Sequence, residues 1–215
     1  MGVGEAAKSV PVRAYKRPPV IEALIDLQFE SAHTEKDIKA LRPKFSSIYN
    51  LIDTQEFEVT IEPNGSVTSK QKNSGFKGPS PDGTDILVVQ KAGLTTSRIP
   101  PYPAWDSSFS LARRNYDLHR ATVGHRAVTR VGCRYVNRID VPDASIPRGG
   151  VRELLNFLPS APPGLTAKPL SFGTRLEFIS EETGFTVILQ SSSLPPALIN
   201  HASFLLDIDI IKNAD

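Results

Sequence analysis

The sequence contains a single cysteine, Cys133, among its 215 residues. One cysteine cannot form a disulfide within the chain, and such bonds are typical of secreted proteins, so the composition favours a reducing cytoplasm. The chain has no apolar run close to the ~18 residues of a membrane span, and its first residues lack the apolar core of a signal peptide. We therefore expect a cytoplasmic protein that does not associate with a membrane.

Motifs of the familiar enzyme classes are also missing. The sequence has no Gly-x-Ser-x-Gly and no phosphate-binding P-loop. Its four histidines do not show the spacing of a zinc site, and two of them, His119 and His125, are expected near a helix end where a cation suits the dipole. No catalytic residue, metal site or cofactor is therefore predicted, although an enzyme with dispersed acidic residues stays open. A net charge of +2 gives no reason by itself to expect a polyanionic partner.

The clearest positive signal is a strand pattern over residues 129–141, where apolar residues alternate with arginines. Residues 20–30 alternate in the same way, with carboxylates at the polar positions. Because side chains alternate between the two faces of a strand, each segment has one apolar and one charged face. The charged positions are Arg130, Arg134 and Arg138 in the first segment and Glu22 and Asp26 in the second. We predict that the two strands lie in one sheet, near its centre.

Periodicity along the rest of the chain predicts an α+β fold. Helical spacing predicts one helix from Thr34 towards Ile52, kinked or restarted at Pro43, a second over 105–121 and a short third over 151–158. Alternation predicts further strands over 56–62, 66–72, 86–90, 94–99, 170–178, 185–190 and 202–210, with a hairpin turn at Asn64-Gly65. The glycine- and proline-rich residues 73–85 are expected to form an exposed loop.

These elements suggest a domain organisation. Residues 1–18 have no periodicity and are expected to form a flexible leader, followed by a single domain over 19–211. Each half, 19–99 and 127–211, is expected to run strand, helix, then antiparallel strands, with the helix 105–121 joining them. The sequence thus predicts tandem β-α-β-β repeats packed as one antiparallel-sheet core.

Three short motifs together resemble a known family. They are Pro18-Pro-Val-Ile-Glu-Ala23, Pro101-Tyr-Pro-Ala-Trp105 and Arg134-Tyr-Val-Asn-Arg-Ile139, within about residues 18–211. They are similar to motifs of an uncharacterised, sporadically distributed family of bacterial proteins. The resemblance implies a bacterial origin but no activity, cofactor or catalytic residue, because no function is established for that family. Members of the family continue past the last strand into a helical tail, which residues 212–215 are too few to form.

Arginines are concentrated between residues 113 and 138, where there is no lysine and Asp117 is the only acid. A guanidinium group suits bidentate pairing with phosphate or carboxylate. One interpretation is an anion site; the other, which we favour, is that the strand arginines pair with carboxylates of neighbouring strands. Those carboxylates are Glu22, Asp26, Asp207 and Asp209. The anion candidates would then be Arg113, Arg114, Arg120 and Arg126, enough only for weak binding of nucleic acid.

Two other residues are candidates. Asn137 interrupts an apolar strand face and needs a hydrogen-bond partner there. Trp105, with Tyr102 and Phe109, forms an aromatic stripe that is either core or the lining of a ligand pocket between the repeats.

The sequence favours a non-catalytic binding module for a partner protein or a small ligand, with homo-oligomerisation left open. The candidate binding residues are Arg130, Arg134, Asn137, Arg138, Glu22, Asp26 and Trp105. The alternatives are a nucleic-acid-binding or RNA-processing protein that uses the arginine run, and an enzyme with dispersed acidic residues.

Overall fold

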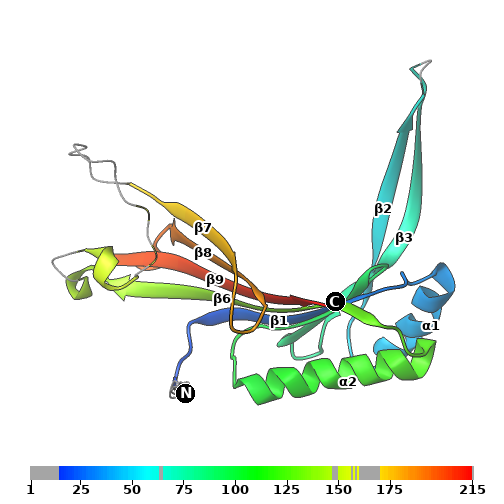
Figure 1. Ribbon diagram of the computed structural model, residues 1–215, viewed down its shortest axis with the longest axis horizontal. Helices are drawn as coiled ribbons and strands as arrows, with labels where there is room; N and C mark the ends of the chain where they lie inside the picture. Colours follow the sequence, from blue (N-terminus) through cyan, green and yellow to red (C-terminus); the bar gives the residue numbers. More distant parts are fainter. Residues whose placement is uncertain are drawn as a thin grey trace, which may run out of the picture.

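A computed structural model describes residues 15–62, 65–146, 150–155, 157, 159 and 170–214. These residues form one antiparallel sheet of nine strands with two α-helices on one side of it (Figure 1). In chain order the elements are β1 (Val20–Phe29), α1 (Glu35–Phe45), β2 (Ile52–Ile61), β3 (Val67–Pro79), β4 (Asp85–Gln90), β5 (Gly93–Arg98), α2 (Trp105–Val123), β6 (Val128–Pro142), the 3₁₀ helices η1 (Asp143–Ser145) and η2 (Val151–Glu153), β7 (Gly173–Ile179), β8 (Thr186–Leu194) and β9 (His201–Asn213).

The centre of the sheet is the antiparallel pair β1 and β6. The strand order is β2-β3-β4-β5-β1-β6-β9-β8-β7, so on each side of this pair the strands follow outward in reverse chain order. The predicted strands at 20–30 and 129–141 are therefore neighbours at the middle of one sheet, which confirms that prediction. Both are the first strand of their half, and each half closes by bringing its last strand back beside its first.

The α+β class is confirmed, but the finer prediction of tandem β-α-β-β repeats is not. The first half contains β1 to β5 and α1, whereas the second contains β6 to β9. In place of the helix predicted over 151–158, Val151–Glu153 form a single 3₁₀ turn. Residues 156 and 158 of that range lie outside the described part, as do residues 1–14 of the predicted leader, Asn64 of the predicted hairpin turn and Asp215 at the end of the chain.

The predicted loop over 73–85 is wrong for most of its length, because β3 continues to Pro79 and pairs with β4. Phe76 of this segment is fully buried in the core. A Cβ atom on Gly75 would lie 2.0 Å from the carbonyl oxygen of Val89, and one on Gly78 would lie 2.0 Å from that of Asn50. These glycines therefore permit close backbone approach within a strand, which composition alone cannot distinguish from a loop.

The helix α1 begins with the capping box that its sequence predicts. The Asp37 N–H donates to Thr34 Oγ1 (3.2 Å), and the Thr34 N–H donates to Asp37 Oδ2 (2.7 Å). Two otherwise unpaired donors at the helix start are thus satisfied. The helix includes Pro43 in its last turn and ends at Phe45, and not near Ile52 as predicted.

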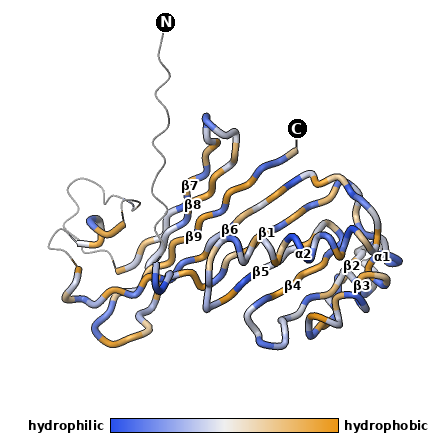
Figure 2. The backbone as a smooth tube through the Cα atoms, turned by 90° about the horizontal axis from the view of Figure 1, so that it is seen from below, coloured by the Kyte–Doolittle hydropathy of each residue, from blue (hydrophilic) through white to orange (hydrophobic). Residues whose placement is uncertain are grey.

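Both helices lie on the same face of the sheet, over the β1–β5 half (Figures 1 and 2). Between them and the sheet lies a core made of Phe29, Ile38, Leu41, Phe45, Tyr49, Phe76, Leu87, Val89 and Leu94. Among the described residues no α-helix covers the other half of this face, where Phe178 is 45% exposed and Val131 is 41% exposed. The apolar alternation of the sequence is therefore buried over only part of the sheet.

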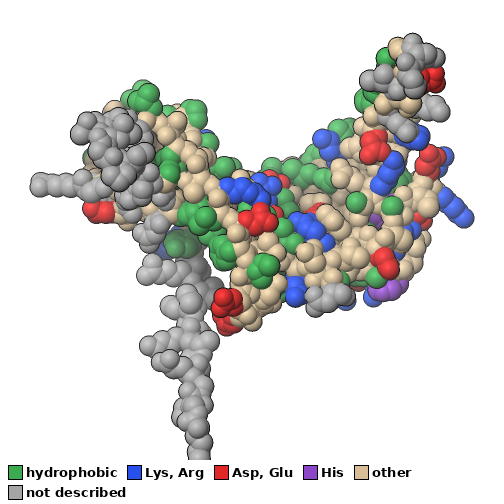
Figure 3. All heavy atoms as spheres, turned by 45° about the horizontal axis from the view of Figure 1, so that its top comes forward, with side chains coloured by type: hydrophobic (Ala, Val, Ile, Leu, Met, Phe, Trp, Pro, Cys, Tyr) green, Lys and Arg blue, Asp and Glu red, His purple; other side chains and the backbone are tan. Residues whose placement is uncertain are grey.

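The opposite face of the sheet carries no helix among the described residues. The β2–β3 hairpin rises on this side at one end of the sheet, and β7–β8 rise at the other (Figure 1). Figure 3 shows the hollow between them, with basic and acidic side chains at its centre. The charged positions of the two central strands thus lie on an open, concave face.

Candidate functional site

The concave face has a cluster of charged side chains at its centre, contributed by three adjacent strands. We call Asp26 of β1, Arg130 and Arg134 of β6, and Asp207 and Asp209 of β9 the polar cluster. The alternation of each strand directs these side chains away from the helices. Antiparallel pairing of β6 with both β1 and β9 then brings them together.

Arg134 forms the strongest contact in the polar cluster. Its Nε donates to Asp207 Oδ1 at 2.8 Å and its Nη2 donates to Asp207 Oδ2 at 2.5 Å, the bidentate geometry that planar guanidinium favours. The Asp207 side chain is only 4% exposed, and Gln190 Nε2 also donates to it at 3.3 Å. These hydrogen bonds to Asp207 raise the pKa of Arg134. In register Arg134 stands opposite Asp209, but its side chain reaches diagonally to Asp207.

Arg130 pairs with the neighbouring strand on the other side. Its Nη1 lies 2.5 Å from Asp26 Oδ2, and Thr95 Oγ1 donates to the second oxygen of Asp26 at 2.7 Å. Both side chains of the ion pair are about one quarter exposed. The interpretation that strand arginines pair with carboxylates is thus confirmed for Arg130 and Arg134.

The carboxyl group of Asp209 does not take part in either of these ion pairs. Among the described residues it has no hydrogen bond and no ion pair within the usual distances. Burial raises the pKa of its carboxyl group, against the opposing influence of Arg130 and Arg134. The polar cluster therefore contains three carboxyl groups and two guanidinium groups, and Asp209, on its β9 side, is the carboxyl group without an ion pair among the described residues.

The predicted pairing is thus wrong for Asp209, and two more of the predicted pairing residues also behave differently. Arg138 pairs with Asp140 of its own strand at 3.1 Å and also donates to Ser203 Oγ and to the carbonyl of Pro195. Glu22 lies beside an irregularity in the β1–β6 register and makes no hydrogen bond among the described residues. The expected pairing is therefore wrong for both: Arg138 has Asp140 of its own strand within reach, and Glu22 lies at the irregularity in the register.

Asn137 is satisfied by the backbone. Its side chain is on the apolar face and it is 9% exposed. Its Nδ2 donates to the carbonyl oxygens of Leu206 at 3.1 Å and Tyr135 at 3.4 Å. This arrangement supports a structural role, since the amide nitrogen has its hydrogen-bond partners without a ligand.

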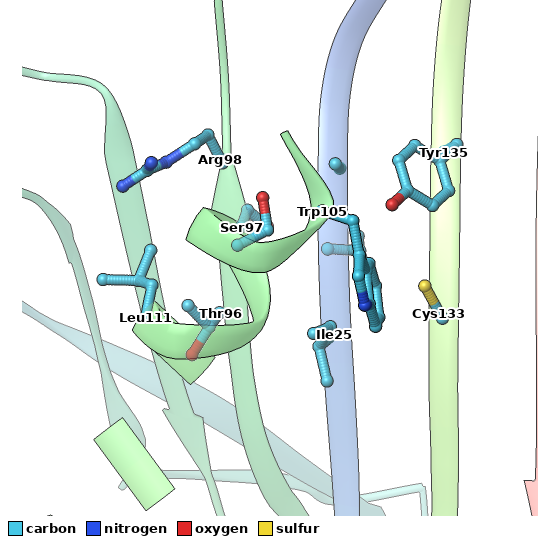
Figure 4. A pocket seen from close by; sticks show the side chains of 11 residues that line it. Ile25, Thr96, Ser97, Arg98, Trp105, Leu111, Cys133 and Tyr135 are labelled. Carbon is cyan, nitrogen blue, oxygen red and sulfur yellow. The ribbon is translucent and has the colours of Figure 1, made fainter. Parts of the chain in front are cut away.

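Trp105 begins α2 and leans over the central strands (Figure 4). The cavity beneath it, lined by Ile25, Thr96, Cys133 and Tyr135 among others, has a volume of about 10 Å³. That is room for one water molecule at most. This cavity therefore cannot be the ligand pocket that the sequence suggested. The alternative, that the aromatic stripe is core, is also wrong for Trp105 and Phe109, which are 45% and 50% exposed, because α2 turns Leu111, Asn115 and His119 towards the core instead.

The four anion candidates outside the sheet all have partners within the protein. Arg113 and Arg120 contact Asp117 at 3.0 and 3.6 Å. Arg114 donates to the hydroxyl of Tyr49 at 3.0 Å. Arg126 binds Asp37 at 2.8 Å and donates to the carbonyl oxygens of Ser31 and Ala32. Arg126 thereby ties the start of β6 to the start of α1, a structural function.

The sequence did not predict a buried pair of histidines. His33 and His119 are 4% and 1% exposed, and their Nε2 atoms lie 2.7 Å apart. His33 Nδ1 lies 2.6 Å from the carbonyl oxygen of Gln90, which can only accept, so this nitrogen carries a proton and His33 Nε2 accepts from His119. His119 Nδ1 is then unprotonated, and it has no partner among the described residues.

The surroundings keep His119 neutral. Phe29 stacks on it with ring centroids 4.7 Å apart. Burial, followed by the charges of His33 and Arg126, lowers its pKa to about 4. The interpretation of His119 as a helix-end cation is therefore wrong. Leu111, Asn115 and His119 follow one another at intervals of four residues, so they lie on one face of the helix. All three are buried, and this spacing is the feature of the sequence that could have placed His119 in the core.

The polar cluster and the histidine pair do not form a metal centre. Across the described ranges no group of three or more His, Cys, Asp or Glu side chains is arranged to hold a metal ion. The two histidine Nε2 atoms already share one hydrogen bond.

Cys133 is half-buried, and not fully buried as its position on the apolar face suggested. Burial, with a contribution from Asp209, nevertheless raises the pKa of its thiol to about 11. Because thiolate is the reactive form, we expect native Cys133 to react with a thiol reagent about a hundredfold more slowly than the same residue in the urea-unfolded chain at neutral pH. Absorbance of the released leaving group would measure both rates, and equal rates would contradict the expectation.

Comparison with known proteins does not identify a family for this chain. No helix in the described part of the chain is long and apolar enough to cross a membrane. No protein-family model matches the sequence, and no curated protein matches it either.

Proposed function

We propose that the protein is a non-catalytic cytoplasmic binding module, and that the concave sheet face binds a partner protein that presents a basic side chain. The observation that carries this proposal is Asp209, a half-buried carboxylate without an ion-pair partner among the described residues. A lysine or arginine of a partner would supply the missing positive charge.

The shape of the face favours a protein over a small ligand. Small molecules bind in enclosed sites that bury most of their surface, whereas this face is open between the β2–β3 hairpin and β7–β8 (Figure 3). Strands with alternating charged side chains can instead contact an extended surface. The small cavity beneath Trp105 lies on the other side of the sheet and takes no part.

The charge balance favours a cationic partner over an anionic one. The two guanidinium groups of the polar cluster are held by Asp26 and Asp207. An incoming phosphate would have to compete with these carboxylates and would meet the negative charge of Asp209. This argues against the nucleic-acid alternative, which requires free arginines on the strand.

The proposal is tested by titrating the ¹⁵N-labelled protein with two short peptides of equal length, one lysine-rich and one glutamate-rich. We expect the lysine-rich peptide to shift the amide signals of β6 and β9 around Arg134 and Asp209. A charge-assisted hydrogen bond contributes about 1.5–3 kcal/mol, so Asp209→Asn should weaken binding by about tenfold or more. Asp143→Asn, which changes an exposed carboxylate in η1, is the matched control and should bind as the unmodified protein does.

Other outcomes would decide against the proposal. Binding of the lysine-rich peptide that Asp209→Asn leaves unchanged would remove the polar cluster from the function. We expect random RNA or DNA to bind no tighter than ~10⁻⁵ M at physiological salt, the range of nonspecific contacts. Tight binding that survives higher salt, and that Arg130→Ala abolishes without unfolding the protein, would favour the nucleic-acid function instead.

A further inference from the structure

The strand β7 forms one edge of the sheet and pairs only with β8 among the described strands. An edge strand presents unpaired N–H and C=O groups that can pair with another chain. Three apolar side chains of β7 are exposed as well: Leu176 at 50%, Phe178 at 45% and Ile179 at 70%. The strand contains no proline and no lysine that would block this edge, and its two charged residues, Arg175 and Glu177, are of opposite sign.

The hydrogen bonds at the two ends of β7 show which residues face the free edge. Ser193 N–H donates to the carbonyl of Phe172, and Ser180 N–H donates to that of Phe185, both in the register that runs unbroken along β7 and β8. Residues that bond the neighbouring strand alternate with residues whose backbone groups point away from it. Phe172 and Ser180 are even-numbered, so the odd-numbered residues of β7, from Gly173 to Ile179, point their N–H and C=O groups outward.

The charges of β7 are self-complementary about Leu176. In an antiparallel pairing with Leu176 opposite Leu176 of a second copy, Arg175 stands opposite Glu177 of that copy and Glu177 opposite its Arg175. These are outward-pointing positions, so the same pairs would exchange backbone hydrogen bonds. Within one chain Arg175 Nη2 lies 2.9 Å from Glu177 Oε2, with both side chains at least half exposed, so both remain accessible to a second copy.

We infer that two copies of the chain associate through antiparallel β7–β7 pairing about a two-fold axis at Leu176. The pairing aligns two Arg–Glu pairs on the concave side and brings the two Leu176 side chains together on the helix side. The sheet then continues from one copy into the other. This inference concerns the sheet edge and does not depend on the polar cluster, so its test is independent of the test of the proposed function.

The other edge of the sheet does not have this property. Strand β2 contains acidic residues and no basic residue, so pairing with itself would place like charges near each other, which is destabilising. Its Asp53 and Glu56 already pair with Arg42 and Lys91 of the same chain. Self-complementarity is therefore specific to β7.

Sedimentation velocity over a range of concentrations measures dimerisation, and variants that exchange the charges of residues 175 and 177 test the inference. The unmodified chain should form a dimer at micromolar concentrations. Arg175→Glu places two carboxylates opposite each other at both symmetric positions, and Glu177→Arg does the same with guanidinium groups, so each single variant should weaken dimerisation by about tenfold or more. The double variant Arg175→Glu/Glu177→Arg restores opposite charges and should dimerise about as well as the unmodified chain.

Glu182→Arg, in the exposed turn between β7 and β8, is the matched control for a charge change outside the pairing and should leave the dimer intact. Circular dichroism should show all four variants folded, since an exposed ion pair contributes at most about 1 kcal/mol to stability. A chain that stays monomeric at high micromolar concentration would overturn the inference. So would a dimer that withstands both single variants, or one that the double variant fails to restore.

Discussion

Arg134→Ala is expected to lower the free energy of unfolding by about 2–3 kcal/mol. The reason is Asp207, whose 4% exposed carboxylate would lose both hydrogen bonds of its bidentate partner and keep only the longer contact with Gln190. Removing one partner of a buried ion pair costs about 3–5 kcal/mol. The Arg134 side chain is 41% exposed, and solvent screening reduces the expected loss below that range.

Thermal unfolding followed by circular dichroism measures this effect. For a chain of this size the loss corresponds to a fall in Tm of roughly 5–10 °C. Arg113→Ala is the control, because it removes an exposed i, i+4 pair with Asp117 and should change stability by no more than about 0.5 kcal/mol. In an Asp207→Asn background, Arg134→Ala should cost clearly less, since the buried charge is gone. An unchanged Tm, with binding lost, would make Arg134 a ligand contact and not a structural residue.

Acidification from pH 6.5 to pH 4 is expected to remove about 3 kcal/mol of stability through His119. The pKa of this buried side chain falls from its ordinary 6.5 to about 4 in the folded protein, and a pKa difference of one between the folded and unfolded states corresponds to about 1.36 kcal/mol. The unfolded chain binds the proton more readily over this interval, so stability rises with pH between the two values. The free energy of unfolding that depends on neutral His119 is therefore retained above about pH 6.5 and falls as the pH decreases towards 4. The pKa of His33 is also lowered by burial, so it acts in the same direction.

Urea unfolding at a series of pH values measures this dependence. His119→Gln is the informative variant, because a glutamine amide can still donate to His33 Nε2 but does not titrate in this interval. We expect the variant to lose most of the slope between pH 4 and 6.5. His125→Gln is the control, and should keep the slope of the unmodified protein. Asp37 and Arg126 are the charged groups that face the same region, but the pKa of Asp37 is lowered from its ordinary 3.8 and a guanidinium group stays protonated throughout, so a slope that persists in His119→Gln would assign the pH dependence to His33.

The positions of the central strands could be predicted from the sequence because the signal there is local. Alternation over 129–141 and 20–30 determines which side chains share a face, whatever the rest of the chain does. The opposite charges of the two polar faces then favour placing the strands side by side. The same parity is sufficient to predict that Arg130 and Arg134 lie on a charged face and that Cys133 lies on an apolar one.

The choice of partner within that face required the tertiary structure. Whether Arg134 binds Asp207 or Asp209 depends on the register of β6 with β9 and on the diagonal reach of the side chain. Parity treats the two carboxylates alike, and so could not show that Asp209 would be left unpaired. A shift of two residues in this register, which keeps every side chain on its face, would put Asp209 in the place that Asp207 now has.

Three features were decided by packing between distant segments, and no local pattern reports such contacts. His33 and His119 are 86 positions apart, and meet because α2 lies over the end of β1. The glycines of β3 resemble a loop in composition, yet they lie where two backbones approach too closely for a Cβ atom. Periodicity determined which face of each strand is apolar. Only the placement of the two helices decided that the main core forms over β1–β5 and leaves several apolar side chains of β6 to β9 exposed, among them Val131 and Phe178.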